Sequence, residues 1–341
     1  SGSALAYAVS GALILLILAF TGSLVSHARR DGIEDRRREL ANLAQTLAAH
    51  AARAFESLDM LQDGLIDLLA EEGVDNTPQL RQVMGTQTMN VVMRAKMSTL
   101  PSVDALAVID QTGRVVNTTR VWPPPPVNVA DRGYFRALSN PDGPPIYLSE
   151  PVRSMMTEKV VIYLGQRILT RQGRFLGVMI GALEQSLFEQ FYAGVKLGGD
   201  GMIALVRTDG ALLARAPGSA GVPSADPAMR ARAAAAIFSP DGAGDLAAGI
   251  LDEKTRLAAV HKVAHLPMAV VVSDSWPAVD ALLMQRAMPQ LLAMALLCCA
   301  IALIGYGVAR HLGRERAFAD AQHAMARRDP LTGLANRLAF T

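Results

Sequence analysis

Two long runs without charged side chains lie near the two ends of the chain. The first extends from Ser1 to Ser26, and the second lies between Arg286 and Arg310. As helices that rise 1.5 Å per residue, they would be about 39 Å and about 35 Å long, more than the roughly 30 Å of a bilayer's hydrocarbon core. The pattern therefore predicts transmembrane helices at residues 4–27 and 285–309. A cleaved signal peptide is the alternative for the first run, but the run is longer than the about 7 to 15 apolar residues of such a peptide.

After the first run, the apolar positions have a helical period. From Leu40 to Leu69 they recur at steps of three and four, which places one apolar stripe along a helix. We expect a long helix over residues 28–75, ended by the turn-forming residues that begin at Gly73. A second, shorter helix is predicted over Pro78–Met97.

The pattern then changes to short strands with alternating apolar positions. Ala105–Ile109 and Val115–Thr118 flank a turn that contains Gly113, as in a β-hairpin. The same arrangement returns around Gly210, which indicates a duplicated module. Strands flanked by helices predict an antiparallel sheet with helices on one face, an α+β fold used twice. Further strands are predicted near Ile146–Val152, Lys159–Leu169 and Phe175–Leu183, and again near Thr255–Val263 and Met268–Ser273.

Composition and charge exclude several classes of protein. Hydrophobic residues make up 51% of the 341 residues and charged residues 19%, so the chain is not a disordered protein. A net charge of +2 gives no basic field, so nucleic acid is not an expected partner. Cys298 and Cys299 are adjacent and cannot form a disulfide framework. His261 and His265 fit a strand surface better than a metal site, and nothing marks a nucleophile, so we predict no metal ligand and no catalytic residue.

The order of these elements resembles the double Cache sensor domain of bacterial receptors. The resemblance covers roughly residues 30–277 and rests on the segments Asp131–Ala137, Glu150–Ser154, Gln172–Val178, Phe188 with Phe191–Tyr192, and Asp209–Pro217. It implies an α+β fold of two PAS-like (double Cache) modules on the long N-terminal helix, flanked by the two transmembrane helices. The membrane-distal module would comprise residues 76–196 and the membrane-proximal module residues 197–277. In this family the distal module is the one that usually holds a small ligand.

A short motif lies at the C-terminal end. The pattern D-x-L-T-G-L-x-N-R is filled at every fixed position, by Asp329, Leu331, Thr332, Gly333, Leu334, Asn336 and Arg337. It is similar to the opening segment of GGDEF domains, the diguanylate cyclases. The resemblance implies a signalling helix at residues 310–328, the start of a GGDEF domain at 329–341, and a remainder after Thr341 that would use Mg and GTP to make cyclic di-GMP. Within residues 1–341 we expect no cofactor.

Charged residues beside the apolar runs predict the orientation. Arginines with few acids follow the second run, beginning with Arg310 and Arg314, as is typical of a cytoplasmic flank. The cluster that begins with Arg29 and Arg30 argues the other way, but acidic residues interrupt it and a long loop weakens the rule. We therefore expect a protein of the bacterial inner membrane, with residues 28–277 in the periplasm and both termini in the cytoplasm.

Candidate ligand-binding residues follow from the chemistry of a pocket for a small anion. Such a pocket needs a fixed cation and aromatic walls. Arg132, Tyr134 and Phe135 supply both in one segment, and Tyr163 and Arg167 share one face of a predicted strand. The alternatives are that Arg132 pairs with a neighbouring acid and that the strand face is solvated. The predicted binding residues are Arg132, Tyr134, Phe135, Tyr147, Arg153, Tyr163 and Arg167.

Together these features predict that residues 1–341 form a transmembrane sensor that lacks the catalytic residues of the full-length protein. We expect a homodimer in membrane lipid that binds a small anionic molecule and controls a C-terminal diguanylate cyclase. One alternative is a receptor with a degenerate GGDEF domain, or with an appended phosphodiesterase that sets the output. Chemoreceptors and histidine kinases share the sensor architecture, but the motif at Asp329–Arg337 argues against both.

Overall fold

The computed structural model describes residues 2–154, 157–197, 199–218, 226–239, 245–246 and 250–326. Contacts divide the chain into two compact units. The helical unit comprises Ser1–Asp35 with Asp280–Thr341, and the sensor unit comprises Arg36–Val279. The predicted GGDEF segment at Asp329–Arg337 lies outside the described residues.

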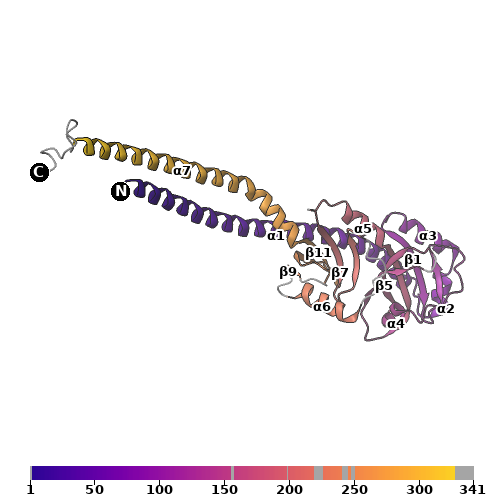
Figure 1. Ribbon diagram of the computed structural model, residues 1–341. Coiled ribbons are helices and arrows are strands. Elements are labelled where there is room, and N and C mark those ends of the chain that lie inside the picture. The colour runs from indigo at the N-terminus through magenta and orange to yellow at the C-terminus, as the bar shows by residue number, and fades with distance from the viewer. Residues whose placement is uncertain are drawn as a thin grey trace. The chain divides into compact units, whose positions relative to one another are not determined.

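Parts of two long helices make up the helical unit. The helices are α1, Gly2–Glu71, and α7, Trp276–Ala326 (Figure 1). Both are long and apolar enough to cross a membrane, with windows of mean hydropathy 2.3 and 2.5 that are only 6% buried. Side chains such as Leu15 and Leu303 are 69% and 71% exposed. Contiguous apolar surface of this kind is rare on soluble monomers, and a lipid phase would cover it.

The end of α1 and the helices that follow it depend on local capping. Gly73 adopts a left-handed backbone conformation, φ 67°, which confirms the predicted end of the long helix. The single helix predicted over Pro78–Met97 is wrong, because the chain forms two helices, α2 (Thr77–Met84) and α3 (Gln87–Met97). The Thr86 hydroxyl accepts a 3.1 Å hydrogen bond from the Met89 backbone and starts α3.

The first half of the sensor unit, which we call the distal module, has an antiparallel sheet of strand order β2-β1-β6-β5-β3, with β4 also paired to β5. The elements are β1 (Val103–Asp110), β2 (Val115–Thr118), α4 (Gly133–Ser139), β3 (Ile146–Leu148), β4 (Val152–Arg153), β5 (Val160–Leu169), β6 (Phe175–Glu184) and α5 (Gln185–Ala193). The predicted β1–β2 hairpin is confirmed. Its turn needs Gly113, because φ is 82° and a Cβ there would lie 2.7 Å from the backbone of Ala130.

The second half, the proximal module, repeats this plan. Its sheet has the order β8-β7-β11-β10-β9. The elements are β7 (Gly201–Arg207), β8 (Leu212–Ala216), α6 (Pro227–Phe238), β9 (Asp245–Leu246), β10 (Arg256–Lys262) and β11 (Met268–Ser275). In both sheets the hairpin strands lie at one edge and the last strand of the module pairs with the first. The predicted duplication is therefore confirmed at the level of topology.

Helix α1 packs against both sheets through the part that belongs to the sensor unit. Leu58 is fully buried, and a Cβ at Gly181 of β6 would lie 2.3 Å from its Cδ1 atom. Gln62 donates a 3.1 Å hydrogen bond to the carbonyl of Leu164 on β5. Arg36, nearer the start of the sensor unit, donates from Nε to the Asp274 carboxylate of β11 at 2.7 Å. The distal sheet thus has one face against α1, and the candidate site lies on the other.

Candidate functional site

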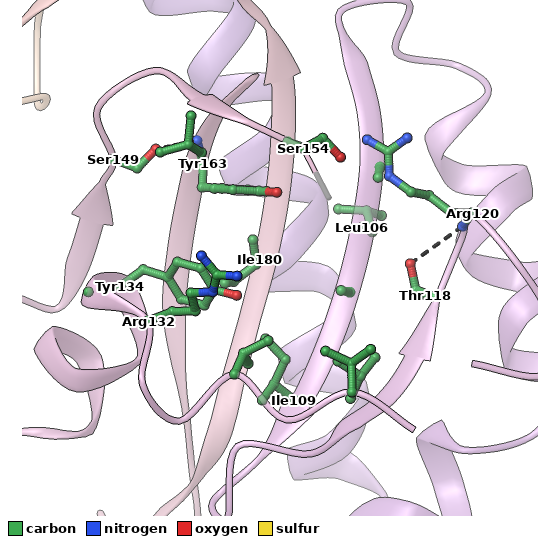
Figure 2. Close-up of a pocket in the computed structure, with 18 of the residues that line it drawn as sticks. Leu106, Ile109, Thr118, Arg120, Arg132, Tyr134, Ser149, Ser154, Tyr163 and Ile180 are labelled. Atoms are coloured by element: carbon green, nitrogen blue, oxygen red, sulfur yellow. Dashed lines mark hydrogen bonds between the residues drawn. The ribbon is translucent and has the colours of Figure 1, made fainter. Parts of the chain in front are cut away.

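A cavity of about 470 Å³ lies in the distal module. Residues of β1, β2, β5 and β6, of the segment before α4 and of the segment around β3 and β4 line it (Figure 2). Small-molecule sites are typically clefts of about 300 to 1,000 Å³. The size therefore suits a metabolite-sized ligand.

Small side chains make the space at the floor of this cavity. Ala105 and Ala107 of β1 and Ala182 of β6 all line it. Ala105 is the register partner of Ala182 across the two strands, and Ala107 is the partner of Ile180. Successive residues of a strand face opposite sides, so Ile180 and Ala182 face the cavity whereas Gly181 between them faces α1. The sheet between the cavity and α1 is one strand layer thick.

Two tyrosines form an aromatic wall. The rings of Tyr134 and Tyr163 lie 5.6 Å apart at 55°, a tilted arrangement favoured by aromatic pairs. Tyr163 projects from β5 into the cavity (Figure 2). Burial raises the pKa of both phenols; for Tyr163, the charges of Arg120 and Arg132 and a hydrogen bond with Ser154 oppose this effect. Both tyrosines are therefore neutral at physiological pH and can donate a hydrogen bond to an anion.

Arg132 and Arg120 bring positive charge to the cavity from two sides. Arg132 is the N-cap residue of α4, and its backbone N–H donates to the carbonyl of Val129 at 3.0 Å. Arg120 follows β2, and its backbone N–H donates to the Thr118 hydroxyl at 3.4 Å (Figure 2). The Arg120 guanidinium forms an ion pair with Asp104 of β1, where the two side chains are 13% and 9% exposed.

The segment between β3 and β5 forms a further wall, and Ser149 fixes its course. The Ser149 hydroxyl accepts a 2.8 Å hydrogen bond from the backbone N–H of Tyr163 and donates a 2.6 Å bond to the carbonyl of Glu150. Ser149, Glu150, Arg153 and Ser154 all line the cavity. Arg153 is more loosely held: its side chain is 62% exposed, with the Glu158 carbonyl at 3.0 Å.

Five of the seven predicted residues line the cavity, namely Arg132, Tyr134, Tyr147, Arg153 and Tyr163. Whether they bind a ligand stays a prediction. The other two, Phe135 and Arg167, lie outside this cavity. Phe135 is 5% exposed, because α4 turns it toward the sheet, where its ring and that of Phe175 form a T-shaped pair. Arg167 lies four residues along β5 from Tyr163, a distance of about 13 Å that places it past the cavity. Its guanidinium instead donates to the carbonyls of Asn140, Pro141 and Gly143.

Comparison with solved structures identifies the type of fold. The extracellular domain of a protein described as a histidine kinase, rpHK1S-Z16, aligns with a TM-score of 0.57 and 25% identity over 72% of this chain and 97% of that one. The ligand-binding domain of the Pseudomonas aeruginosa PAO1 amino acid chemoreceptor PctB, in complex with L-Arg, aligns with a TM-score of 0.54 and 17% identity over 75% and 94%. The chain has a Cache-like sensor fold. No family model and no curated protein matches the sequence.

A third neighbour extends the likeness to a larger protein. An extracellular ligand binding receptor from Desulfohalobium retbaense DSM5692 aligns with a TM-score of 0.51 and 13% identity, over 70% of this chain and 40% of that one. PctB and the Desulfohalobium protein are described as ligand-binding receptors, and at 17% and 13% identity they show that this chain shares their fold. The three neighbours do not distinguish the outputs, because their full proteins are described as a kinase, a chemoreceptor and a receptor.

The described residues contain no cluster of side chains suited to binding a metal ion. Residues 2–326, apart from the gaps given above, contain no group of three or more His, Cys, Asp or Glu that could hold a metal ion. His261 and His265 are both exposed, at and beyond the end of β10. Arginine, tyrosine and serine side chains, together with Thr118 and Glu150, make up the polar lining of the cavity, and its arginines suit recognition of an organic anion.

Proposed function

We propose that residues 1–341 are the sensing and membrane-spanning part of a receptor that binds a small carboxylate-bearing molecule in the distal cavity. The observation that carries the proposal is the set of three arginines, Arg120, Arg132 and Arg153, that line one cavity together with tyrosines. Guanidinium groups recognise carboxylates with paired donors, and aromatic walls exclude water. Amino acids are the first class to test, since L-Arg is bound to the chemoreceptor PctB.

The ligand acts through a change in packing. It can shift the receptor between two arrangements only by binding one of them more tightly. The face of the distal sheet opposite the cavity packs on α1, which is continuous from Gly2 to Glu71. We propose that the receptor works as a homodimer in the bacterial inner membrane, with residues 28–277 in the periplasm and both termini in the cytoplasm.

A thermal-unfolding screen tests the ligand proposal. The 341-residue chain in detergent micelles is heated with amino acids, dicarboxylates and amines. A ligand at 100 times its Kd stabilises the fold by about 2.7 kcal/mol, which is about 5 to 11 °C in Tm for a domain of this size. We expect Arg132→Ala to remove this shift and Arg136→Ala, an exposed residue one turn further along α4, to retain it. Equal shifts in both variants would refute the site.

For the output we propose a GGDEF diguanylate cyclase. The support is the motif Asp329–Arg337, since the sensor fold occurs with other outputs. Mg and GTP belong to that domain and not to residues 1–341. The encoded sequence after Thr341, followed by an assay of GTP turnover with Mg on the whole protein, tests this. A degenerate loop or an appended phosphodiesterase would establish the alternative output.

Protease treatment of sealed spheroplasts tests the topology. We expect the protease to cut within residues 28–277 and to leave tags at both termini intact. Protection of the central region in sealed cells, with cleavage after lysis, would contradict the proposed orientation.

A further inference from the structure

One segment of the cavity wall is also held by the proximal module. Glu150 is the only acidic side chain among the described residues that line the cavity. Its carboxylate accepts hydrogen bonds from Arg230 of α6 and Arg207 of β7, both of which belong to the proximal module. The wall between β3 and β4 thus contacts the cavity and the second module at once.

The arginines hold this wall at several points. Arg230 approaches the carboxylate with both terminal nitrogens, Nη1 to Oε1 at 2.7 Å and Nη2 to Oε2. Arg207 reaches Oε1 at 3.3 Å and donates from Nη1 to the carbonyl of Leu148 at 2.6 Å. Asp209 also holds Arg207, because the Nε–H of Arg207 donates a 2.9 Å hydrogen bond to Oδ1 of Asp209. Paired, charge-assisted bonds of this kind are stronger and more directional than neutral ones.

Inside the cavity, the same wall is tied to the aromatic side. Ser149 bridges the backbone N–H of Tyr163 to the carbonyl of Glu150, so the position of Glu150 depends on the strand that carries the cavity tyrosine. The Glu150 side chain is 35% exposed, and Glu150 lines the cavity. A ligand that contacts Glu150, or displaces Ser149, competes with the hold of Arg207 and Arg230.

We propose that Glu150 couples occupancy of the distal cavity to the proximal module through Arg207 and Arg230. The inference rests on the proposed function of the cavity as a ligand site. Coupling between two sites is reciprocal: loss of the arginine contacts changes the affinity of the cavity for a ligand by the same factor as the ligand changes those contacts. The same contacts hold residues 146–154, so their loss also changes the mobility of the cavity wall. The coupling therefore has a signature that is measurable without any ligand.

Hydrogen exchange on the full chain in detergent measures that signature. In Arg230→Gln we expect amide exchange in residues 146–154 to rise about tenfold, because a bidentate bond to a charged group is lost. In Glu150→Gln we expect a similar rise in 201–207 and 227–238. The matched control is Arg232→Gln, which removes the same charge from an exposed position on the same helix and should change neither region.

The outcomes separate coupling from simple loss of stability. Exchange in β1 serves as the internal reference and should stay unchanged, and Arg230→Lys should restore only part of the protection because lysine lacks the planar fork. If residues 146–154 exchange alike in Arg230→Gln and Arg232→Gln, the coupling is refuted even when a ligand binds the cavity. The opposite result is that no ligand is found in the screen, while Arg230→Gln and Glu150→Gln still raise hydrogen exchange in each other's module. That result would overturn the proposed function but not the contact between Glu150 and the two arginines.

Discussion

The contact between helix α1 and the distal sheet depends on a residue without a side chain. Gly181 of β6 lies against Leu58, which is fully buried. A Cβ at Gly181 would lie 2.3 Å, 2.6 Å and 2.8 Å from the Cδ1, Cδ2 and Cγ atoms of Leu58. Carbon atoms in contact are about 3.5 to 4.0 Å apart, so Gly181→Ala must displace the leucine or the helix by about 1 Å. By overpacking this contact, the substitution tests how closely α1 packs on the distal sheet.

The expected magnitudes follow from this geometry. Overpacking of a close-packed core costs about 1 to 3 kcal/mol, and Leu58→Ala alone costs about 2 to 5 kcal/mol through the cavity that it leaves. The double variant removes the atoms that clash, so its loss of unfolding free energy should fall short of the sum by about 1 to 3 kcal/mol. For a domain of this size each kcal/mol is worth about 2 to 4 °C in Tm.

Thermal unfolding of the 341-residue chain in detergent provides the assay. The control is Gly64→Ala, at an exposed position of α1 where a Cβ would meet nothing within 4 Å. There the better helix propensity of alanine should stabilise the fold by about 0.5 to 1 kcal/mol, so the same substitution has opposite signs at the two sites. If Gly181→Ala leaves Tm unchanged, or the effects of Gly181→Ala and Leu58→Ala simply add, α1 is not seated on β6 as described.

Three further predictions address the cavity, the pH dependence and the membrane. Ala182→Leu should fill the floor of the cavity and abolish any ligand-induced shift in Tm, although overpacking at this buried position also lowers the Tm of the free protein; a retained shift would place the ligand elsewhere. Burial raises the pKa of Asp110, but hydrogen bonds from Thr112 and Arg81 outweigh it and hold the pKa below its usual value. The ionised carboxylate therefore stabilises the fold above about pH 4, and this contribution is lost as the pH falls through the lower folded pKa, so Asp110→Asn should lower Tm at pH 7 and flatten its decline in acid. An unchanged acid profile would contradict this account. Leu15→Asp should impair membrane insertion, at about 2.5 to 3.5 kcal/mol for a charge at a helix centre, as measured by the carbonate-resistant fraction; full insertion would show that the residue is not in the hydrocarbon core.

The architecture was predictable from the sequence where the signal is local. The stripe of apolar residues from Leu40 to Leu69 needs only a helical period, and the two hairpins need only alternation around Gly113 and Gly210. The break between α2 and α3 was missed, because Gly85 and the Thr86 cap weigh little against an otherwise helical pattern.

The site was less predictable, since it depends on neighbours across strands. The alternation of side chains along β5 predicted that Tyr163 and Arg167 share one face, and Tyr163 lines the cavity. Arg167 does not, because it lies too far along the strand from Tyr163. Arg120 was missed although it lies just past the β2 hairpin strand, because nothing local in the sequence indicates its ion pair with Asp104. Glu150 lay in a segment singled out for the resemblance, yet its arginine partners are far along the sequence.

The position of Gly181 has a consequence for how a signal leaves the cavity. Ile180 and Ala182 line the cavity and Gly181 meets Leu58 of α1, so consecutive residues of one strand touch the two sides. A layer of side chains between them could absorb a small displacement, but no side chain is present at Gly181. Protein interiors are close-packed, and a strand cannot shift at two alternate residues without moving the one between. We therefore expect a ligand that moves Ala182 to move the surface on which Leu58 rests, so that α1 responds to the cavity as well as the proximal module held through Glu150.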